Sequence, residues 1–128
     1  GAAYVFRSHG AGWTQEAELV GVYSNGMELF GTSVRLNGDS AFVGSPGASH
    51  NGTQSGLVYR FAYDGTAWLL NSLIVPSDNV FYDSVGRSLD IAGERLLVGV
   101  PGDDDRGDGS GSAVLFNLDI LFRDEFEP

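Results

Sequence analysis

The sequence repeats itself at a period of 55 residues without a gap, and this repetition restricts the possible folds more than any other feature of the chain. Residues 42–61 read FVGSPGASHNGTQSGLVYRF, and residues 97–116 read LVGVPGDDDRGDGSGSAVLF. The matching positions include Gly1, Gly56 and Gly111; Phe6, Phe61 and Phe116; Trp13 and Trp68; Gly31 and Gly86; Gly44 and Gly99; and Pro46 and Pro101. Such repeats are typical of folds in which copies of one small unit pack against each other.

Four β-strands are predicted within each period. They cover residues 30–36, 41–46, 56–61 and 68–75 in one period, residues 85–91, 96–101 and 111–116 in the next, and residues 1–6 and 13–20 at the start of the chain. Val34 and Leu36 alternate with polar neighbours, as a half-buried strand requires. The turn Asn37–Asp39 then suits a tight hairpin.

The apolar residues of these strands are predicted to form the core. Trp13, Ala17 and Leu19 are expected to share one face of their strand, because side chains alternate along a strand. Aromatic residues at matching positions are expected to pack between neighbouring units: Tyr4, Tyr59, Phe6, Phe61, Phe116, Trp13 and Trp68.

No segment shows sustained helical periodicity, so we predict an all-β fold. Four-stranded antiparallel units that repeat at this length are typical of β-propeller blades, each of which buries its faces against its neighbours. A β-sandwich whose halves are similar by coincidence is the alternative. The gapless match at many positions favours the propeller blades.

The stretches FGTSVRLNGDSAFVGSPG at residues 30–47 and VGRSLDIAGERLLVGVPG at residues 85–102 resemble FG-GAP repeats, the blades of integrin-α-like β-propellers. The resemblance extends from Gly1 to Phe116, although Val85 replaces the Phe of the second FG, and GSP and GVP replace GAP. In the integrin-type blade a calcium loop joins the first two strands. Here that hairpin is shortened to residues 37–39 and 92–94, so the family's usual calcium site is not expected.

The resemblance implies about two blades plus extra N-terminal strands. Residues 1–20 are expected to be the last two strands of one blade, residues 30–75 a complete blade, residues 85–116 a second blade, and residues 117–128 a tail or substitute strand. Propellers close with about four to eight blades, and unpaired blades would expose large apolar patches. We therefore expect either a piece of a longer propeller or a subunit that assembles with further copies of itself.

Charge and composition exclude several classes of partner and chemistry. The net charge of -10 would repel a phosphate backbone, so no nucleic-acid partner is expected. The chain has no cysteine, which excludes disulfides and thiolate chemistry. No apolar run approaches the roughly 18 residues of a membrane-spanning helix, so no transmembrane segment is expected.

The loop over residues 101–112, PGDDDRGDGSGS, is the most conspicuous polar feature. Asp103, Asp105 and Asp108 could supply oxygen ligands to Ca²⁺, which takes six to eight oxygens in flexible geometry. The matching loop over residues 46–56 has no carboxylate, so one loop is predicted to hold a cation while the other connects strands. A solvated acidic loop without a metal is the alternative.

Two short motifs also lie in these loops. Asn51-Gly52-Thr53 fits the acceptor pattern for N-glycosylation, which has meaning only in a secretory pathway that glycosylates. Arg106-Gly107-Asp108 spells a tripeptide that integrins recognise in their ligands, and we interpret it as a chance match.

The resemblance and the strand repeats favour a non-enzymatic structural or binding module, extracellular or on the cell surface. The alternative is a carbohydrate- or ligand-recognition domain attached to a secreted enzyme or adhesin, with Trp13 and Trp68 available to stack on sugars. An enzyme is not expected, because His9 and His50 lie in predicted turns and no pair of nucleophile and base is evident. Ca²⁺ is the only candidate cofactor.

Overall fold

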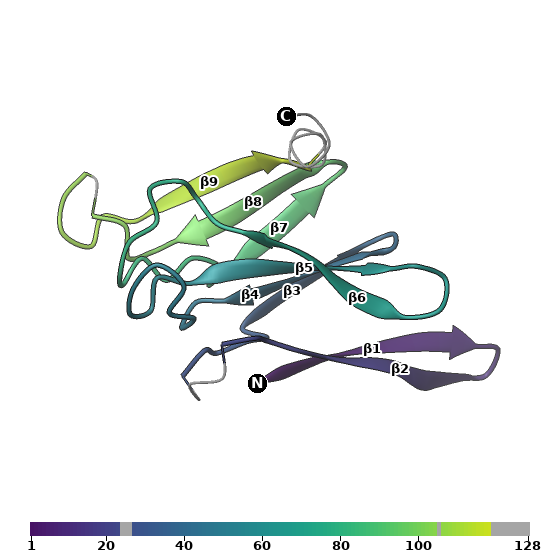
Figure 1. Cartoon of the computed structure of the whole chain (residues 1–128). Coiled ribbons are helices and arrows are strands. Elements are labelled where there is room, and N and C mark those ends of the chain that lie inside the picture. Colours follow the sequence, from purple (N-terminus) through teal and green to yellow (C-terminus); the bar gives the residue numbers. More distant parts are fainter. Residues whose placement is uncertain (24–26, 105, 119–128) are drawn as a thin grey trace, which may run out of the picture.

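The computed structural model describes residues 1–23, 27–104 and 106–118, and over these residues the chain forms nine β-strands in three antiparallel sheets (Figure 1). The N-terminal sheet contains β1 (Ala2–His9) and β2 (Gly12–Val20). The middle sheet contains β3 (Ser33–Asn37), β4 (Ser40–Ser45), β5 (Leu57–Tyr63) and β6 (Trp68–Ile74), in that order. The C-terminal sheet contains β7 (Leu89–Ala92), β8 (Arg95–Val100) and β9 (Ser112–Asn117). The expected antiparallel all-β architecture is confirmed.

The first strand of each period begins later than the sequence predicted. β3 starts at Ser33 and β7 at Leu89, whereas the apolar pattern placed the starts near residues 30 and 85. Gly31 and Gly86 have φ angles of +95° and +93°, which belong to the left-handed region and interrupt an extended strand. The FG glycine therefore forms a turn that leads into the strand.

The three sheets stack face to face, with the middle sheet between the other two (Figure 1). One core cluster joins the N-terminal and middle sheets and includes Leu19, Phe30, Ala41, Val43, Leu57, Tyr59 and Phe61. The other joins the middle and C-terminal sheets and includes Phe42, Val58, Ile74, Leu89, Leu96, Val98 and Val100. Adjacent residues such as Phe42 and Val43 thus enter different clusters, because side chains alternate across a strand.

The sequence repeat is also a repeat of contacts. Three backbone hydrogen bonds recur after a shift of 55 residues: Gly31 N to Gly44 O and Gly86 N to Gly99 O, both 3.1 Å; Gly47 N to Glu28 O, 2.9 Å, and Gly102 N to Asp83 O, 3.0 Å; and Gly56 N to Ala48 O and Gly111 N to Asp103 O, both 2.9 Å. Residues at these matching positions therefore make the same backbone hydrogen bonds. This equivalence allows each position to be compared with its counterpart in another sheet.

A close approach of two backbones explains one of the repeated glycines. A Cβ atom added at Gly44 on β4 would lie 2.0 Å from the carbonyl oxygen of Gly86. Real Cβ atoms do not approach a backbone atom this closely, so a larger residue at position 44 would force the middle and C-terminal sheets apart.

A β-bulge corrects the expected arrangement of Trp13. The register shifts between Val5 and Phe6, so that β2 contributes an extra residue at this point, and the same irregularity recurs in the middle sheet between residues 60 and 61. Trp13 pairs with Ser8, whereas Ala17 pairs with Val5. Because a bulge reverses the alternation of side chains, Trp13 does not share the face of Ala17, and the prediction was wrong.

Candidate functional site

The outer face of the N-terminal sheet is open. Tyr4 and Phe6 are 52% and 51% exposed, although their counterparts Tyr59 and Phe61 in the middle sheet are 0% and 5% exposed. The prediction that all the repeated aromatic residues lie in the core is therefore wrong for the first copy. The reason is packing: the described residues provide no sheet that covers this face of β1.

The outer face of the C-terminal sheet is open in the same way. Leu97 is 46% exposed, whereas Phe42, its counterpart on β4, is fully buried. Ala113 is exposed, whereas its counterpart Val58 is fully buried. Equivalent positions are thus buried where a neighbouring sheet is present and exposed where the described chain has none.

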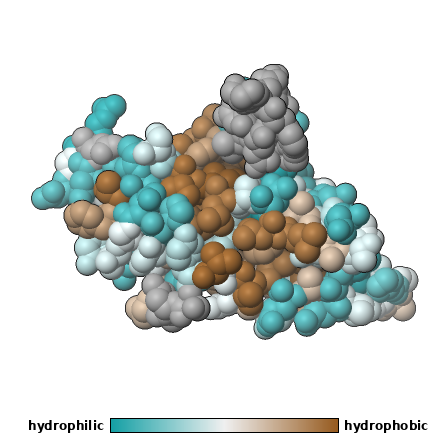
Figure 2. Space-filling model, in the orientation of Figure 1, coloured by the Kyte–Doolittle hydropathy of each residue, from teal (hydrophilic) through white to brown (hydrophobic). Residues whose placement is uncertain are grey.

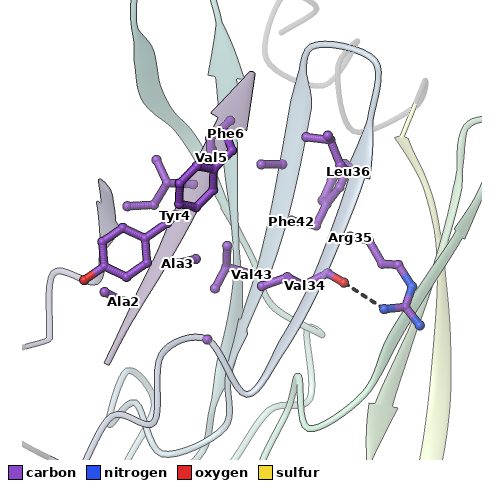
Figure 3. Close-up of a pocket in the computed structure, with 13 residues that line it drawn as sticks. Ala2, Ala3, Tyr4, Val5, Phe6, Val34, Arg35, Leu36, Phe42 and Val43 are labelled. Atoms are coloured by element: carbon purple, nitrogen blue, oxygen red, sulfur yellow. Dashed lines mark hydrogen bonds between the residues drawn. The ribbon is translucent and has the colours of Figure 1, made fainter. Parts of the chain in front are cut away.

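An apolar groove of about 540 Å³ lies between β1 and the β3–β4 hairpin (Figure 3). Val34, Leu36, Ala41 and Val43 line it from the middle sheet, and residues of β1 line it from the other side. Val34 and Leu36 are exposed, while their counterparts Leu89 and Ile91 are buried and half-buried in the next interface. Figure 2 shows that hydrophobic side chains reach the surface in the middle of the molecule.

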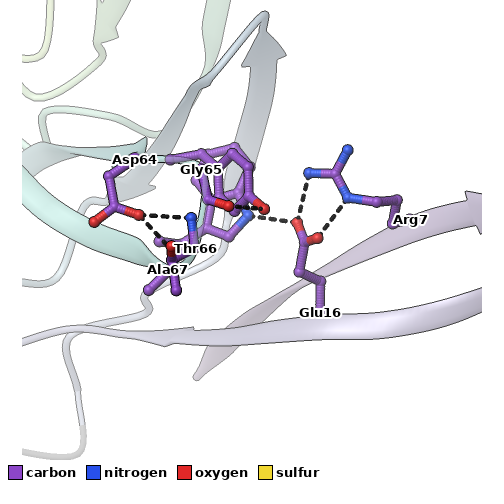
Figure 4. Close-up of polar contacts among 8 residues, drawn as sticks. Arg7, Glu16, Asp64, Gly65, Thr66 and Ala67 are labelled. Atoms are coloured by element: carbon purple, nitrogen blue, oxygen red, sulfur yellow. Dashed lines mark hydrogen bonds and ion pairs between the residues drawn. The ribbon is translucent and has the colours of Figure 1, made fainter.

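Polar side chains of β1 and β2 join the N-terminal sheet to the middle sheet (Figure 4). The indole Nε1 of Trp68 donates a 2.8 Å hydrogen bond to Glu16 Oε2, and Arg7 holds the same carboxylate through Nε and through Nη2 at 3.0 Å. The hydrogen bonds from Arg7 and Trp68 lower the pKa of Glu16. Trp68 therefore packs between sheets, which is the first of the two roles expected for it; the other was stacking on a sugar.

Glu28 and Tyr59 close the loop end of the first interface. The Tyr59 hydroxyl donates to Glu28 Oε1 and accepts a 3.0 Å hydrogen bond from the backbone N of Val22. Both side chains are buried. Burial, followed by the hydrogen bond to Glu28, raises the pKa of Tyr59.

The corresponding end of the second interface is an acidic pocket. Asp83 and Val114 occupy the positions of Glu28 and Tyr59, so the carboxylate is shorter and the phenol is absent. A pocket of about 260 Å³ lies here, with Asp78, Asp83, Asp103 and Arg106 among its lining residues.

Asp83 is the buried carboxylate of this pocket. Its Oδ2 accepts a 2.9 Å hydrogen bond from Val80 N, but burial raises its pKa, and the neighbouring Asp103, Asp78 and Asp104 raise it further. The sequence did not single out Asp83, although comparison of position 83 with Glu28 would have marked it as a repeated acid beside a lost tyrosine.

One of the three predicted calcium ligands lines this pocket. Asp103 lines it, Asp108 is exposed in the loop that leads to β9, and Asp105 lies outside the described residues. Two hydrogen bonds shape the loop: Gly111 N donates to the backbone oxygen of Asp103, and Gly109 N donates to the side-chain Oδ1 of Asp104 at 2.6 Å. Over residues 1–23, 27–104 and 106–118, no three His, Cys, Asp or Glu side chains form a metal-binding group. The calcium site stays a prediction.

Two further features are exposed in loops. Asn51 is exposed, and its backbone N donates to Ser55 Oγ at 2.9 Å, so glycosylation there stays a prediction.

Phe81 and Tyr82 are also exposed and pack edge to face at 5.6 Å. Tyr82 N donates to Thr53 O at 2.8 Å, which fixes the aromatic pair on the neighbouring loop. Sequence reasoning missed this pair, which has no aromatic counterpart in the other repeat.

Comparison with known proteins agrees with the repeat seen in the structure. The family model of the FG-GAP repeat matches residues 13–61 and again residues 68–116, so the two matches are offset by the same 55 residues as the contacts above. Neither the comparison with curated proteins nor the comparison with solved structures gives a match. In the described part of the chain no helix is long and apolar enough to cross a membrane.

Proposed function

Since the chain belongs to the FG-GAP repeat family, we propose that it is a non-enzymatic structural or binding module built from propeller blades. It works outside the cell or at the cell surface, where proteins with these repeats are typically found. Its partners are further blades, either copies of this chain or other parts of a longer propeller.

The observation that carries this proposal is the contrast between buried and exposed counterparts. Tyr59 and Phe42 are fully buried in the middle sheet, while Tyr4 and Leu97 at the two ends are about half exposed. Exposed apolar patches of this kind are typical of interaction surfaces. The covering partner must therefore offer a sheet face similar to those already present.

Mass measurement tests the assembly. Circular dichroism establishes that the purified chain is folded. Light scattering over a range of concentrations should then show association, or, if the chain stays monomeric, apolar dyes should bind to its open faces. A well-folded monomer that does neither would contradict the proposal.

Ligand recognition, with a carbohydrate as the ligand, is the second candidate function, and the Phe81–Tyr82 pair favours it. Both rings are exposed on a loop that backbone hydrogen bonds hold in place, and the acidic pocket with Asp78 and Arg106 offers polar groups nearby. Rigid aromatic surfaces with a few polar neighbours suit ligand binding.

A glycan array separates this candidate from the first. Binding that is lost in Tyr82→Ala but kept in Leu69→Ala would support carbohydrate recognition, because Leu69 is equally exposed on the outer strand β6. If the folded wild-type chain binds no glycan, carbohydrate recognition is contradicted and the structural role remains.

A further inference from the structure

The apolar groove beside β1 lies next to an unpaired strand edge. Among the described residues β1 pairs only with β2, whereas its counterpart β5 pairs with β4 on the opposite edge and its counterpart β9 pairs with β8. The free edge of β1 therefore lies at the place where a strand equivalent to β4 or β8 is found in the other sheets. An exposed edge with an apolar face beside it is a template for another strand.

The second interface shows which side chain would fill the groove. There Phe42 on β4 packs in one cluster with Leu89, Leu96 and Val98. Moving these three receiving positions back by 55 residues gives Val34, Ala41 and Val43, which all line the groove. The groove is therefore the receptor for a residue that corresponds to Phe42.

The chain itself carries such a residue in an exposed position. Moving Phe42 forward by 55 residues gives Leu97 on β8, which is 46% exposed on the open face of the C-terminal sheet. Donor and receptor lie on opposite sides of the middle sheet (Figure 1), so one molecule cannot bring them together.

We propose that the β7–β8 hairpin of a second copy of this chain fills the groove and adds β8 to the free edge of β1. This inference rests on the proposed function and specifies the partner and the surface. Leu97 of the second copy then packs on Val34 and Leu36, as Phe42 packs in the second interface. Each copy has one groove and one hairpin, so copies associate head to tail.

Addition of β8 to β1 requires β8 to leave β9, and the repeat makes this exchange nearly balanced. β1 and β9 are counterparts: Gly1, Ala3 and Phe6 correspond to Gly111, Ala113 and Phe116. β1 therefore offers β8 the same backbone groups, with Tyr4 in the place of Val114. Exchange of equivalent elements between protomers is a low-cost route to association.

Engineered cysteines test the register that the proposal requires. Leu97 pairs with Leu115 on β9, so in the assembly it lies opposite Val5, and Val98 lies opposite Tyr4. Because the natural chain has no cysteine, every disulfide is introduced. The two double variants to compare are Val5→Cys/Leu97→Cys and Tyr4→Cys/Val98→Cys. Hydrogen-bonded and non-hydrogen-bonded pairs alternate along an antiparallel ladder, so one of the two cysteine pairs occupies the type of pair whose Cα atoms are closer together. The expected result is a disulfide between chains in at least one of them.

The double variant Tyr4→Cys/Leu97→Cys is the matched control. Its cysteines are offset by one residue and lie on opposite faces, so no link is expected. Equal cross-linking in the control, or none in either test variant of a folded sample, would overturn the proposal.

A second measurement tests the groove without any change on β1. Leu36→Asp places a charge in the groove at a position that is 63% exposed in the single chain, so the fold should persist. We expect association to weaken by about tenfold or more, because the charge would be buried without a partner. Leu69→Asp, at an exposed position of β6, is the control that should leave association unchanged.

The outcomes separate this proposal from the proposed function. If the wild-type chain associates but Leu36→Asp associates equally well, the head-to-tail groove is wrong and the structural role stands. If a synthetic peptide of residues 85–100 binds a chain that stays monomeric, the groove takes a hairpin from elsewhere in a longer chain. The proposal that a second copy supplies the hairpin is then overturned. A folded wild-type monomer that neither binds this peptide nor binds apolar dyes would overturn both.

Discussion

Trp68 Nε1 donates a 2.8 Å hydrogen bond to Glu16 Oε2, and this bond ties β6 of the middle sheet to β2 of the N-terminal sheet. Arg7 donates to both oxygens of the same carboxylate, from Nε to Oε1 and from Nη2 to Oε2. Arg7 and Glu16 lie on the two strands of one hairpin, whereas Trp68 lies 52 residues beyond Glu16 in the sequence. Their meeting shows that a repeated tryptophan acts in packing between sheets.

Glu16→Gln should make the stability of the chain less dependent on acid. The pKa of Glu16 is lowered in the folded protein by Arg7 and Trp68, so its stabilising effect is present above the pKa of the unfolded chain, near 4.5, and is lost as the pH falls. Melting temperatures of wild type and variant should therefore differ most near neutral pH and converge in acid. Glu18→Gln, on the same strand, is the control; a constant difference at every pH would contradict the expectation.

Tyr59→Phe should destabilise the fold by about 1–3 kcal/mol, because it leaves the buried carboxylate of Glu28 without its hydroxyl donor. Urea unfolding measures the loss. Tyr63→Phe removes a hydroxyl that is exposed and bonded to Gly65 O, so it should cost much less. Equal losses in both variants would show that the Glu28 contact has no special weight.

Asp83→Asn should stabilise the protein near neutral pH. The pKa of Asp83 is raised by burial and by neighbouring carboxylates, so the folded state binds a proton more tightly than the unfolded chain. The contribution of protonated Asp83 to stability is fully present below the pKa of the unfolded chain, near 3.8, and is lost as the pH rises through the pKa of Asp83 in the folded protein. The variant keeps an acceptor for Val80 N and removes the charge. Its gain in melting temperature should vanish in acid; Asp39→Asn, in an exposed turn, should show no such gain.

Gly44→Ala should cost about 1–3 kcal/mol or more, and Gly99→Ala distinctly less. A Cβ at Gly44 would lie 2.0 Å from the backbone oxygen of Gly86, whereas a Cβ at Gly99 would meet the Ser88 side chain, which can rotate away. Chemical unfolding of the two variants measures the difference. Equal costs would mean that the close contact between sheets is unimportant to stability.

Calcium should raise the melting temperature if the acidic loop binds it, since a ligand that binds only the folded state stabilises that state. The shift should appear at millimolar Ca²⁺, disappear with EDTA and be lost in Asp103→Asn/Asp108→Asn. Asp39→Asn should keep the shift. Identical melting of the wild-type chain in Ca²⁺ and EDTA would refute the predicted site.

The candidate sites were predictable to different degrees. Asp103 and Asp108 were visible as a run of acids in a glycine-rich loop, because composition alone marks such a loop. Asp83 was not, since its burial and its raised pKa depend on which loops come together around it. The Phe81–Tyr82 pair was missed because nothing in its own sequence shows that the rings stay exposed.

The sequence by itself determined the repeating unit, its strands and its turns, because alternation, glycine and proline act over a few residues and recur at a fixed period. Tertiary structure alone decided which copies of each residue are buried. Tyr4 and Tyr59 are identical residues at one repeat position, yet one is half exposed and the other fully buried. The physical reason is that burial of a sheet face requires a second sheet against it, and the described chain supplies that neighbour for Tyr59 and not for Tyr4.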